Sequence, residues 1–356
     1  MRGSRRITRT PANSLLLGCM PKGCQLCIRG AKLVLFVTGL CTRGCYYCPL
    51  SEKRRNKDVV CANERPVKSD RDVIEEARLI NALGTGLTGG DPSLRFGRTL
   101  HYLRLLKRKF GKRHHVHMYV GGELSPKQLR ELKRAGLDEV RFHTWSVKPV
   151  EAALKAGLRA GVEVPAILNR FEKTKSLLRK LDEIGCTFAN LNELEFSDTN
   201  LAAMKARGFR IKSDTSMAVK GSEELARKLM RWAARNTRLN IHYCPSSLKD
   251  GVQLRNRLRR RAKNVAKPYE EITEDGLLVK GVIHGLPASK LAATRRHLVS
   301  KYRAPPKLIA IDREKKRIEL PRQVAEKLAK LEPDMKFALV EEYPTYDRLE
   351  TMFIPL

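Results

Sequence analysis

The sequence is poor in acidic residues: 38 Asp and Glu stand against 71 Lys and Arg, which gives a formal net charge of +33 over 356 residues. That excess is far larger than solubility requires, and it attracts polyanions at long range. RNA or DNA is therefore the expected partner, with anionic lipid as the alternative. Glutamine is also scarce, with four residues, which is typical of heat-adapted proteins. Some heat-adapted cytoplasmic proteins are simply basic, and that explanation of the charge stays open.

Long apolar runs are absent as well. No stretch approaches the roughly 20 apolar residues that cross a bilayer, so we expect no membrane-spanning segment. Of the two polyanions, nucleic acid is preferred, and no membrane partner is expected. The apolar segment of residues 15–17 is too short for the hydrophobic region of a signal peptide. Nine cysteines, six of them between Cys19 and Cys48, do not resemble a small secreted disulfide scaffold. We therefore expect a cytoplasmic protein with metal-bound thiolates.

Three cysteines, Cys41, Cys45 and Cys48, lie within eight residues, directly after the apolar run of residues 32–40. The run predicts a buried strand, which places the thiols on the loop at its C-terminal end. Three thiolates on one short loop can hold three irons of a cubane cluster and leave the fourth iron open. Zinc prefers a closed set of four ligands, and a zinc loop completed by a distant residue is the alternative.

Between about residues 30 and 245 the sequence alternates short β-like runs with helix-like segments. Six such βα units are predicted, and repeated βα units form a parallel sheet. Gly89 and Gly90 end the second predicted strand and precede Asp91. Consecutive glycines allow a ligand to approach the backbone closely. The ends of all these strands are expected to face one pocket.

The Cys41-x3-Cys45-x2-Cys48 spacing, with Tyr47 before the last cysteine, resembles the signature of the radical S-adenosylmethionine (SAM) superfamily. The resemblance implies a partial (β/α)6 barrel and a [4Fe–4S] cluster whose open iron is chelated by the amino and carboxylate groups of SAM. It also implies reductive cleavage of SAM to a 5′-deoxyadenosyl radical, with an electron donor such as ferredoxin.

The segment of Gly89, Gly90 and Asp91 resembles the glycine-glycine-glutamate element of that superfamily, whose backbone binds the methionine amino group. Asp91 stands where the family often has Glu. Two further short segments, Pro-Leu-Ser after Cys48 and Glu-Leu-Glu after Asn192, resemble the sequences of an archaeal group described as related to pyruvate formate-lyase activating enzyme. That similarity implies ancestry and leaves the substrate open.

Polar residues near the ends of the later strands are candidates to contact the cofactor or the substrate. Asn192 and Glu193 are the preferred pair, because the run of residues 190–195 is unusually polar for a barrel strand. Alternate members of such a run can instead point outward, to helices or solvent. The other candidates are Glu123, His143, Asn169, Arg170, Asn190 and Glu195.

A second close group of thiols lies upstream and consists of Cys19, Cys24 and Cys27. It resembles a metal knuckle, which needs a fourth ligand or an open metal. Cys244 is the preferred fourth ligand, and Cys61 is the other candidate. Zinc and an auxiliary iron–sulfur cluster both fit this group, while unligated thiols are the alternative. We regard His114, His115 and His117 as surface or phosphate-facing histidines.

Residues 249–267 hold eight basic residues and one acid. The expected nucleic-acid contacts there are Arg255, Arg257, Arg259, Arg260, Arg261 and Lys263. The predicted organisation is a cysteine-rich extension (1–30), the partial barrel (31–245), a basic connecting segment (246–272) and a small α+β accessory domain (273–356).

Together these features lead us to expect a radical SAM enzyme that modifies structured RNA, tRNA or rRNA. One alternative is an activase for a glycyl-radical enzyme or another protein. The other is a non-catalytic nucleic-acid-binding protein with a structural metal.

Overall fold

The computed structural model describes residues 5–356, which divide into two compact units, one ending at Leu254 and the other spanning Arg255–Leu356. Within this described part of the chain, no helix combines the length and the apolar character needed to cross a membrane. Residues 1–4, where the predicted cysteine-rich extension begins, lie outside the described residues.

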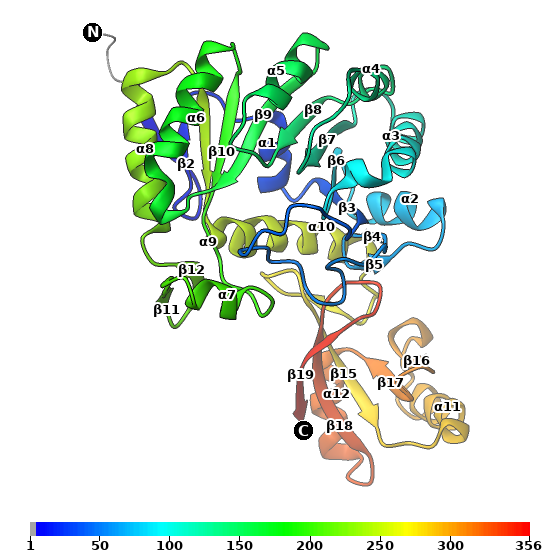
Figure 1. Ribbon diagram of the computed structural model, residues 1–356. Helices are drawn as coiled ribbons and strands as arrows, with labels where there is room; N and C mark the ends of the chain where they lie inside the picture. Colours follow the sequence, from blue (N-terminus) through cyan, green and yellow to red (C-terminus); the bar gives the residue numbers. More distant parts are fainter. Residues whose placement is uncertain (1–4) are drawn as a thin grey trace. The chain divides into compact units, whose positions relative to one another are not determined.

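The first unit is built on a curved sheet that contains seven consecutive parallel strands (Figure 1). In spatial order these are β3 (Lys32–Thr38), β6 (Gly84–Gly89), β7 (His115–Val120), β8 (Glu139–Phe142), β9 (Arg159–Pro165), β10 (Phe188–Asn192) and β13 (Asn240–Cys244). The first six correspond to the six predicted βα units, so the expected partial barrel is confirmed. β13 adds a seventh parallel strand beside β10.

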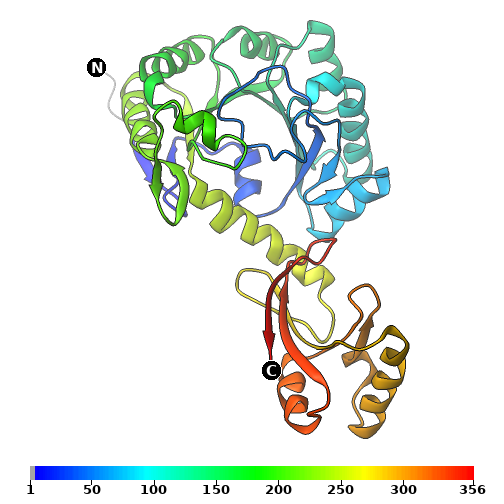
Figure 2. The same cartoon turned by 60° about the horizontal axis from the view of Figure 1, so that its bottom comes forward.

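Helices follow the strands and form an outer ring around the sheet, which Figure 2 shows clearly. They are α2 (Asp70–Leu79), α3 (Phe96–Phe110), α4 (Pro126–Arg134), α5 (Lys148–Lys155), α6 (Phe171–Glu183) and α8 (Ser222–Asn236). The apolar faces of these helices and of the strands form one large core. The start of α4 follows from its sequence, because Ser125 and Gln128 form a capping box and a proline occupies the first helical position.

The N-terminal segment joins the same sheet. β1 (Ile7–Arg9) pairs with β2 (Leu15–Leu17), and β2 pairs antiparallel with β13, Leu17 opposite Ile241. The short helix α1 (Lys22–Ile28) then packs against β3, β6 and β7. Cys24 and Cys27 lie on this helix, and Cys19 precedes it.

Shorter elements complete the first unit. A hairpin of β11 (Ile211–Ser213) and β12 (Ser216–Val219) forms a separate two-stranded sheet. The remaining elements are β4 (Cys61–Ala62), β5 (Arg65–Pro66), α7 (Leu201–Lys205), α9 (Ser246–Leu248), the 3-10 helices η1 (Pro92–Arg95) and η2 (Leu168–Arg170), and the π-helix η3 (Lys249–Leu254).

The second unit is the expected small α+β domain, built on an antiparallel sheet with its own core. Residues 310–312 and 317–319 pair as an antiparallel hairpin. The strands are β14 (Glu271–Ile272), β15 (Leu278–His284), β16 (Ala310–Asp312), β17 (Arg317–Leu320), β18 (Lys336–Glu342) and β19 (Glu350–Pro355). The helices are α10 (Arg255–Val265), α11 (Leu291–Lys301), α12 (Arg322–Leu331), η4 (Ala288–Lys290) and η5 (Pro306–Leu308).

Candidate functional site

The loop after β3 carries Cys41, Cys45 and Cys48, all three partly exposed. The backbone N–H of Arg43 donates to Cys41 Sγ at 3.4 Å, and Cys48 N–H donates to the Cys45 carbonyl at 3.1 Å. Burial raises the pKa of the Cys41 thiol above its ordinary value. A bound metal ion would offset that effect, because it deprotonates the thiols that it coordinates.

Side chains from other strands hold this loop in place. Tyr47 Oη donates to His143 Nε2 at 2.9 Å, because His143 Nδ1 donates to the Glu163 carbonyl at 3.0 Å and fixes the tautomer. Burial lowers the pKa of His143, so the ring is neutral near pH 7. The Asn200 amide also donates to the Tyr47 carbonyl at 3.1 Å. The loop is therefore tied to β8 and to the segment that follows β10.

Gly89 and Gly90 are required by the close approach of the loop to the end of β6. A Cβ on Gly89 would lie 2.1 Å from the Thr38 carbonyl oxygen, and one on Gly90 would lie 2.3 Å from the Leu40 carbonyl oxygen. Gly90 N–H donates to the Thr38 carbonyl at 2.8 Å. Both glycines line a cavity next to the cysteines. The absence of side chains at these two positions thus allows close contact between the cysteine loop and the end of β6.

Asp91 is buried, and its carboxylate is fully engaged within the protein. Oδ1 accepts from the backbone and hydroxyl of Ser93, and Oδ2 accepts from the N–H groups of Gly121 and Gly122 at 3.0 and 2.9 Å. Asp91 does not line the cavity. Its side chain instead positions Gly121, which does.

The cavity beside the three cysteines has a volume of about 510 Å³ and is bounded by the ends of β6, β7, β8, β9 and β10. Asn192 lines it, and its amide donates to Glu163 Oε1 at 3.0 Å. Glu163 Oε2 accepts from Arg141 at 2.8 Å and from Asn190 at 2.9 Å. The other polar residues of the lining include Arg43, Tyr47, Arg55, Asn56, Thr88, Tyr119 and His143.

Glu163 is charged at neutral pH despite its position. Burial alone would raise its pKa, but the Arg141 guanidinium and the amides of Asn190 and Asn192 lower the pKa below its ordinary value. A fixed carboxylate with its partners already in place therefore faces the cavity. Such a group can accept a hydrogen bond from a ribose hydroxyl or an ammonium group without reorganising.

Glu193, the other half of the predicted pair, points away from the cavity because neighbouring residues of a strand face opposite sides. Its Oε2 accepts from the backbone and hydroxyl of Ser246 at 3.0 and 2.8 Å, and Lys212 lies 3.3 Å from Oε1. Glu193 therefore fastens β10 to the segment after β13. Of the two residues, only Asn192 lines the cavity.

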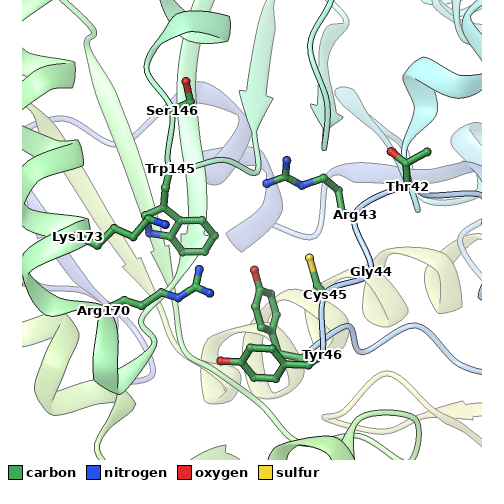
Figure 3. A pocket seen from close by; sticks show the side chains of 10 residues that line it. Thr42, Arg43, Gly44, Cys45, Tyr46, Trp145, Ser146, Arg170 and Lys173 are labelled. Carbon is green, nitrogen blue, oxygen red and sulfur yellow. The ribbon is translucent and has the colours of Figure 1, made fainter.

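A second cavity, of about 590 Å³, lies on the other side of the cysteine loop and is shown in Figure 3. Its lining shares Thr42, Arg43, Gly44, Cys45 and Tyr47 with the first cavity. Arg43, Arg170 and Lys173 contribute three cations, and the lining contains no carboxylate. The Arg170 guanidinium lies 4.7 Å from the Trp145 ring centroid, a favourable cation–π distance. This cationic, aromatic cavity suits an anionic or planar group of a substrate.

The structure divides the remaining candidates. His143 lines the first cavity, Arg170 the second, and Asn190 a third that is described below. Glu123 and Asn169 are exposed and line none of the three, and Glu195 pairs with Lys249. His114 and His117 are buried, which corrects their prediction as surface residues. Thr85 bonds His114 at 2.8 Å, and Lys32 bonds His117.

The cysteines of the second group do not all line the same cavity. Cys24, Cys27 and Cys244 line the third cavity, whereas Cys19 is exposed and lies outside it. Cys61, the other candidate for the fourth ligand, is buried on β4. Across residues 5–356, no three His, Cys, Asp or Glu side chains converge closely enough to hold a single metal ion.

The predicted nucleic-acid residues all lie on α10, with different surroundings. Arg255, Arg259 and Lys263 are exposed at intervals of four residues, so they share one face of the helix. Arg257 and Arg260 are partly exposed. Arg261 is buried, and its guanidinium donates to the Pro344 carbonyl, so it is a structural residue of the second unit.

Several site residues were not predicted from the sequence. Glu163 is the main one, and its signal is a lone charge in the otherwise apolar run of residues 160–167. Tyr119 alternates with buried apolar residues on β7 and reads as an ordinary strand residue. Trp145 and Lys173 line the second cavity only because the loop after β8 and the start of α6 meet there.

Comparison with known proteins agrees with this geometry. A model of the radical SAM superfamily matches residues 35–149, and a domain of unknown function (DUF8061) matches residues 276–356. A Methanocaldococcus jannaschii protein named "putative glycyl-radical enzyme activating enzyme" is 46% identical over 279 residues, 74% of this chain and 73% of that protein. A "probable GTP 3′,8-cyclase" of Aeropyrum pernix is 33% identical over 178 residues, 43% of this chain and 48% of that protein.

Among solved structures, the FeFe-hydrogenase maturase HydG of Carboxydothermus hydrogenoformans matches with a TM-score of 0.42 at 16% identity. That match covers 59% of this chain and 52% of HydG, so the chain spans about half of this structural neighbour.

Proposed function

Because the chain belongs to the radical SAM superfamily, we propose that Cys41, Cys45 and Cys48 hold its [4Fe–4S] cluster and that the adjoining 510 Å³ cavity binds SAM. The donor set supports this, since three thiols on one loop leave an iron open for a small ligand. Once bound, the cluster and SAM supply the 5′-deoxyadenosyl radical that abstracts a hydrogen atom from the substrate.

The residues of the chain position these groups. Tyr47 and His143 fix the loop, and the backbone at Gly89 and Gly90 offers C=O groups close to the thiols, since the Gly90 N–H is already bonded to Thr38. Glu163 and Asn192, already hydrogen-bonded to each other, present acceptors and donors to the polar parts of SAM. The aromatic and aliphatic parts of the lining would limit side reactions of the radical with groups other than the substrate.

We further propose that the substrate is a protein and that the enzyme is an activase, which generates a radical on a glycine of its partner. The observation that carries this proposal is the 46% identity with the Methanocaldococcus jannaschii protein, over nearly three quarters of both chains. A peptide segment would reach the radical through the second cavity, where Trp145 and Arg170 can hold an extended backbone.

RNA modification is the second candidate, and one observation favours it. Arg43, Arg170 and Lys173 line the second cavity without a carboxylate, in a chain with a formal charge of +33. Phosphate groups are the usual ligands of such a cluster. The name of the Methanocaldococcus jannaschii relative supports the protein substrate instead, so we place RNA second.

Deuterium transfer distinguishes the two substrates. Anaerobically reconstituted enzyme, SAM and dithionite are mixed with the protein fraction or the RNA fraction of cells grown on deuterated glycine or on deuterated ribose and methionine. A protein substrate transfers deuterium from a glycine Cα to 5′-deoxyadenosine, which gains about one mass unit. Transfer from the RNA fraction alone would overturn the activase proposal. The C41A/C45A/C48A variant, which should form no 5′-deoxyadenosine, tests the cluster assignment separately.

A further inference from the structure

A third cavity, of about 150 Å³, lies inside the barrel and is lined by three thiols from distant parts of the chain. Cys24 and Cys27 stand three residues apart on α1 and so share one face of that helix, while Cys244 ends β13. The other lining residues are Tyr119, Arg141, Glu163, Asn190, Asn192, His242, Lys249 and Gln253. Tyr119, Glu163 and Asn192 also line the cavity beside Cys41, so these three side chains separate the two cavities.

Nitrogen donors point at these sulfurs. Arg141 Nη2 and Asn190 Nδ2 lie 3.4 and 3.3 Å from Cys24 Sγ, and Gln253 Nε2 lies 3.7 Å from Cys244 Sγ. A thiol sulfur is a weak acceptor, whereas a thiolate that ligates a metal is stabilised by such donors. The arrangement therefore suits coordinated sulfur better than free S–H groups.

His242 offers a nitrogen lone pair at the same place. The Ser14 hydroxyl donates its proton to the Tyr243 carbonyl at 2.7 Å, so its oxygen accepts the bond from His242 Nε2–H at 2.9 Å. Nδ1 then carries no proton, and it is buried without a hydrogen-bond partner in the structure as described.

The position of His242 is also that of a ligand. It is 1% exposed, lies two residues before Cys244 and therefore shares a face of β13 with it. Opposite it on β10 stands Asn190, whose Oδ1 is likewise buried and unpartnered among residues 5–356. Two unsatisfied buried polar atoms beside three thiols indicate a missing ligand, since such atoms are costly in a finished core.

The size of the cavity decides between a single ion and a cluster. Its 150 Å³ equals the share of several water molecules at about 30 Å³ each. A single zinc ion needs four ligands in direct contact, and no group that converges so closely occurs within the described part of the chain. An iron–sulfur cluster brings its own sulfides and spans a wider gap between its cysteines.

We propose that Cys24, Cys27, Cys244 and Nδ1 of His242 hold a second iron–sulfur cluster inside the barrel. Cys19 takes no part, because it is exposed and outside the cavity. Buried Arg141 and partly buried Lys249 supply positive charge that compensates the thiolates. Such a cluster would form whether the substrate is protein or RNA.

Iron content of the full chain tests the proposal. After anaerobic reconstitution, the C41A/C45A/C48A variant should retain about four irons per chain, roughly half the wild-type amount. Adding Cys244→Ala or Cys24→Ala to that background should remove them. Cys19→Ala and Cys186→Ala are the matched controls and should change nothing, since Cys186 is buried elsewhere and bonds only carbonyls.

The role of His242 as the fourth ligand is tested separately, by spectroscopy. In the triple-variant background, His242→Ala should alter the electron paramagnetic resonance spectrum of the reduced cluster, and His242→Cys should restore four-thiolate character. If the triple variant binds no iron, or binds zinc in place of iron, the proposal of a second cluster is wrong. An unchanged spectrum in His242→Ala would overturn the fourth ligand. Gln253→Ala, which removes one N–H···S bond, should shift the reduction potential without losing iron, and this result does not depend on SAM cleavage by the first site.

Discussion

At the scale of single residues, Glu163 connects the polar lining of the barrel. Its two carboxylate oxygens accept from Arg141, Asn190 and Asn192, which come from two other strands. The backbone carbonyl of the same residue accepts from His143 and so helps to fix the cysteine loop. A single charge in an apolar strand thus organises both the cavity and the loop beside it.

Replacing this carboxylate should destabilise the protein and weaken cofactor binding together. We expect Glu163→Gln to lower the free energy of unfolding by about 1.5–3 kcal/mol, because charged hydrogen bonds to a buried partner are lost. Urea unfolding of the metal-free protein measures it. The matched control is Glu172→Gln, an exposed residue paired only with Lys175, which should stay within about 0.5 kcal/mol of wild type. Equal effects of the two substitutions would contradict this role for Glu163.

The same residue predicts a pH dependence. The folded pKa of Glu163 is lowered, so its contribution to stability is present above the ordinary pKa of a glutamate and is lost as pH falls through the folded value. Unfolding measured over a series of acidic pH values should therefore show a shallower loss of stability in Glu163→Gln than in wild type. Parallel acid limbs for the two proteins would argue that Glu163 is not charged in the folded state.

At the scale of elements, the turn after β6 and the loop after β3 depend on each other. Ala at Gly90 would place its Cβ 2.3 Å from the Leu40 carbonyl oxygen and must displace the cysteine loop. We expect Gly90→Ala to lower stability by about 1–3 kcal/mol and to reduce the iron bound at the first site. The control is Gly97→Ala, at a helical position where a Cβ would have nothing within 4 Å. It should leave the iron content unchanged and the free energy of unfolding within about 1 kcal/mol of wild type. Full iron content in Gly90→Ala would refute the coupling.

The elements also show how far sequence alone carries. The alternation of apolar runs and amphipathic segments sufficed for the barrel strands, because that period is local. The pairing of Leu17 with Ile241 was not predicted, since it joins residues over 200 positions apart. For the same reason, the sequence suggested Cys244 as a ligand beside Cys24 without evidence that the two are close, and it did not identify His242. Local periodicity does not encode which strands become neighbours.

At the scale of the whole molecule, the charge of +33 is spread over both units, and only part of it is free to meet a partner. In the second unit, Lys280 contacts Glu270, Glu319 and Glu342 at 3.1, 2.7 and 2.9 Å in the interior. Buried cations of this kind count among the 71 Lys and Arg, but their charge is neutralised in the interior and is not available to a partner. On α10, the exposed cations Arg255, Arg259 and Lys263 share one face that a polyanion can reach.

If RNA is bound through that face, removing its three charges should weaken binding and reduce the slope of log K against log salt by about 2–3, because each phosphate contact contributes about 0.7–0.9. The variant replaces Arg255, Arg259 and Lys263 with Ser, and binding to tRNA is measured near physiological salt with heparin as competitor. The matched control removes three exposed cations from α4, namely Lys127, Arg130 and Arg134. Equal losses in the two variants would mean that the attraction is diffuse and that α10 is no binding site. Such a result would leave the excess charge as a general property of the chain and would strengthen the protein-activase proposal, which does not require it.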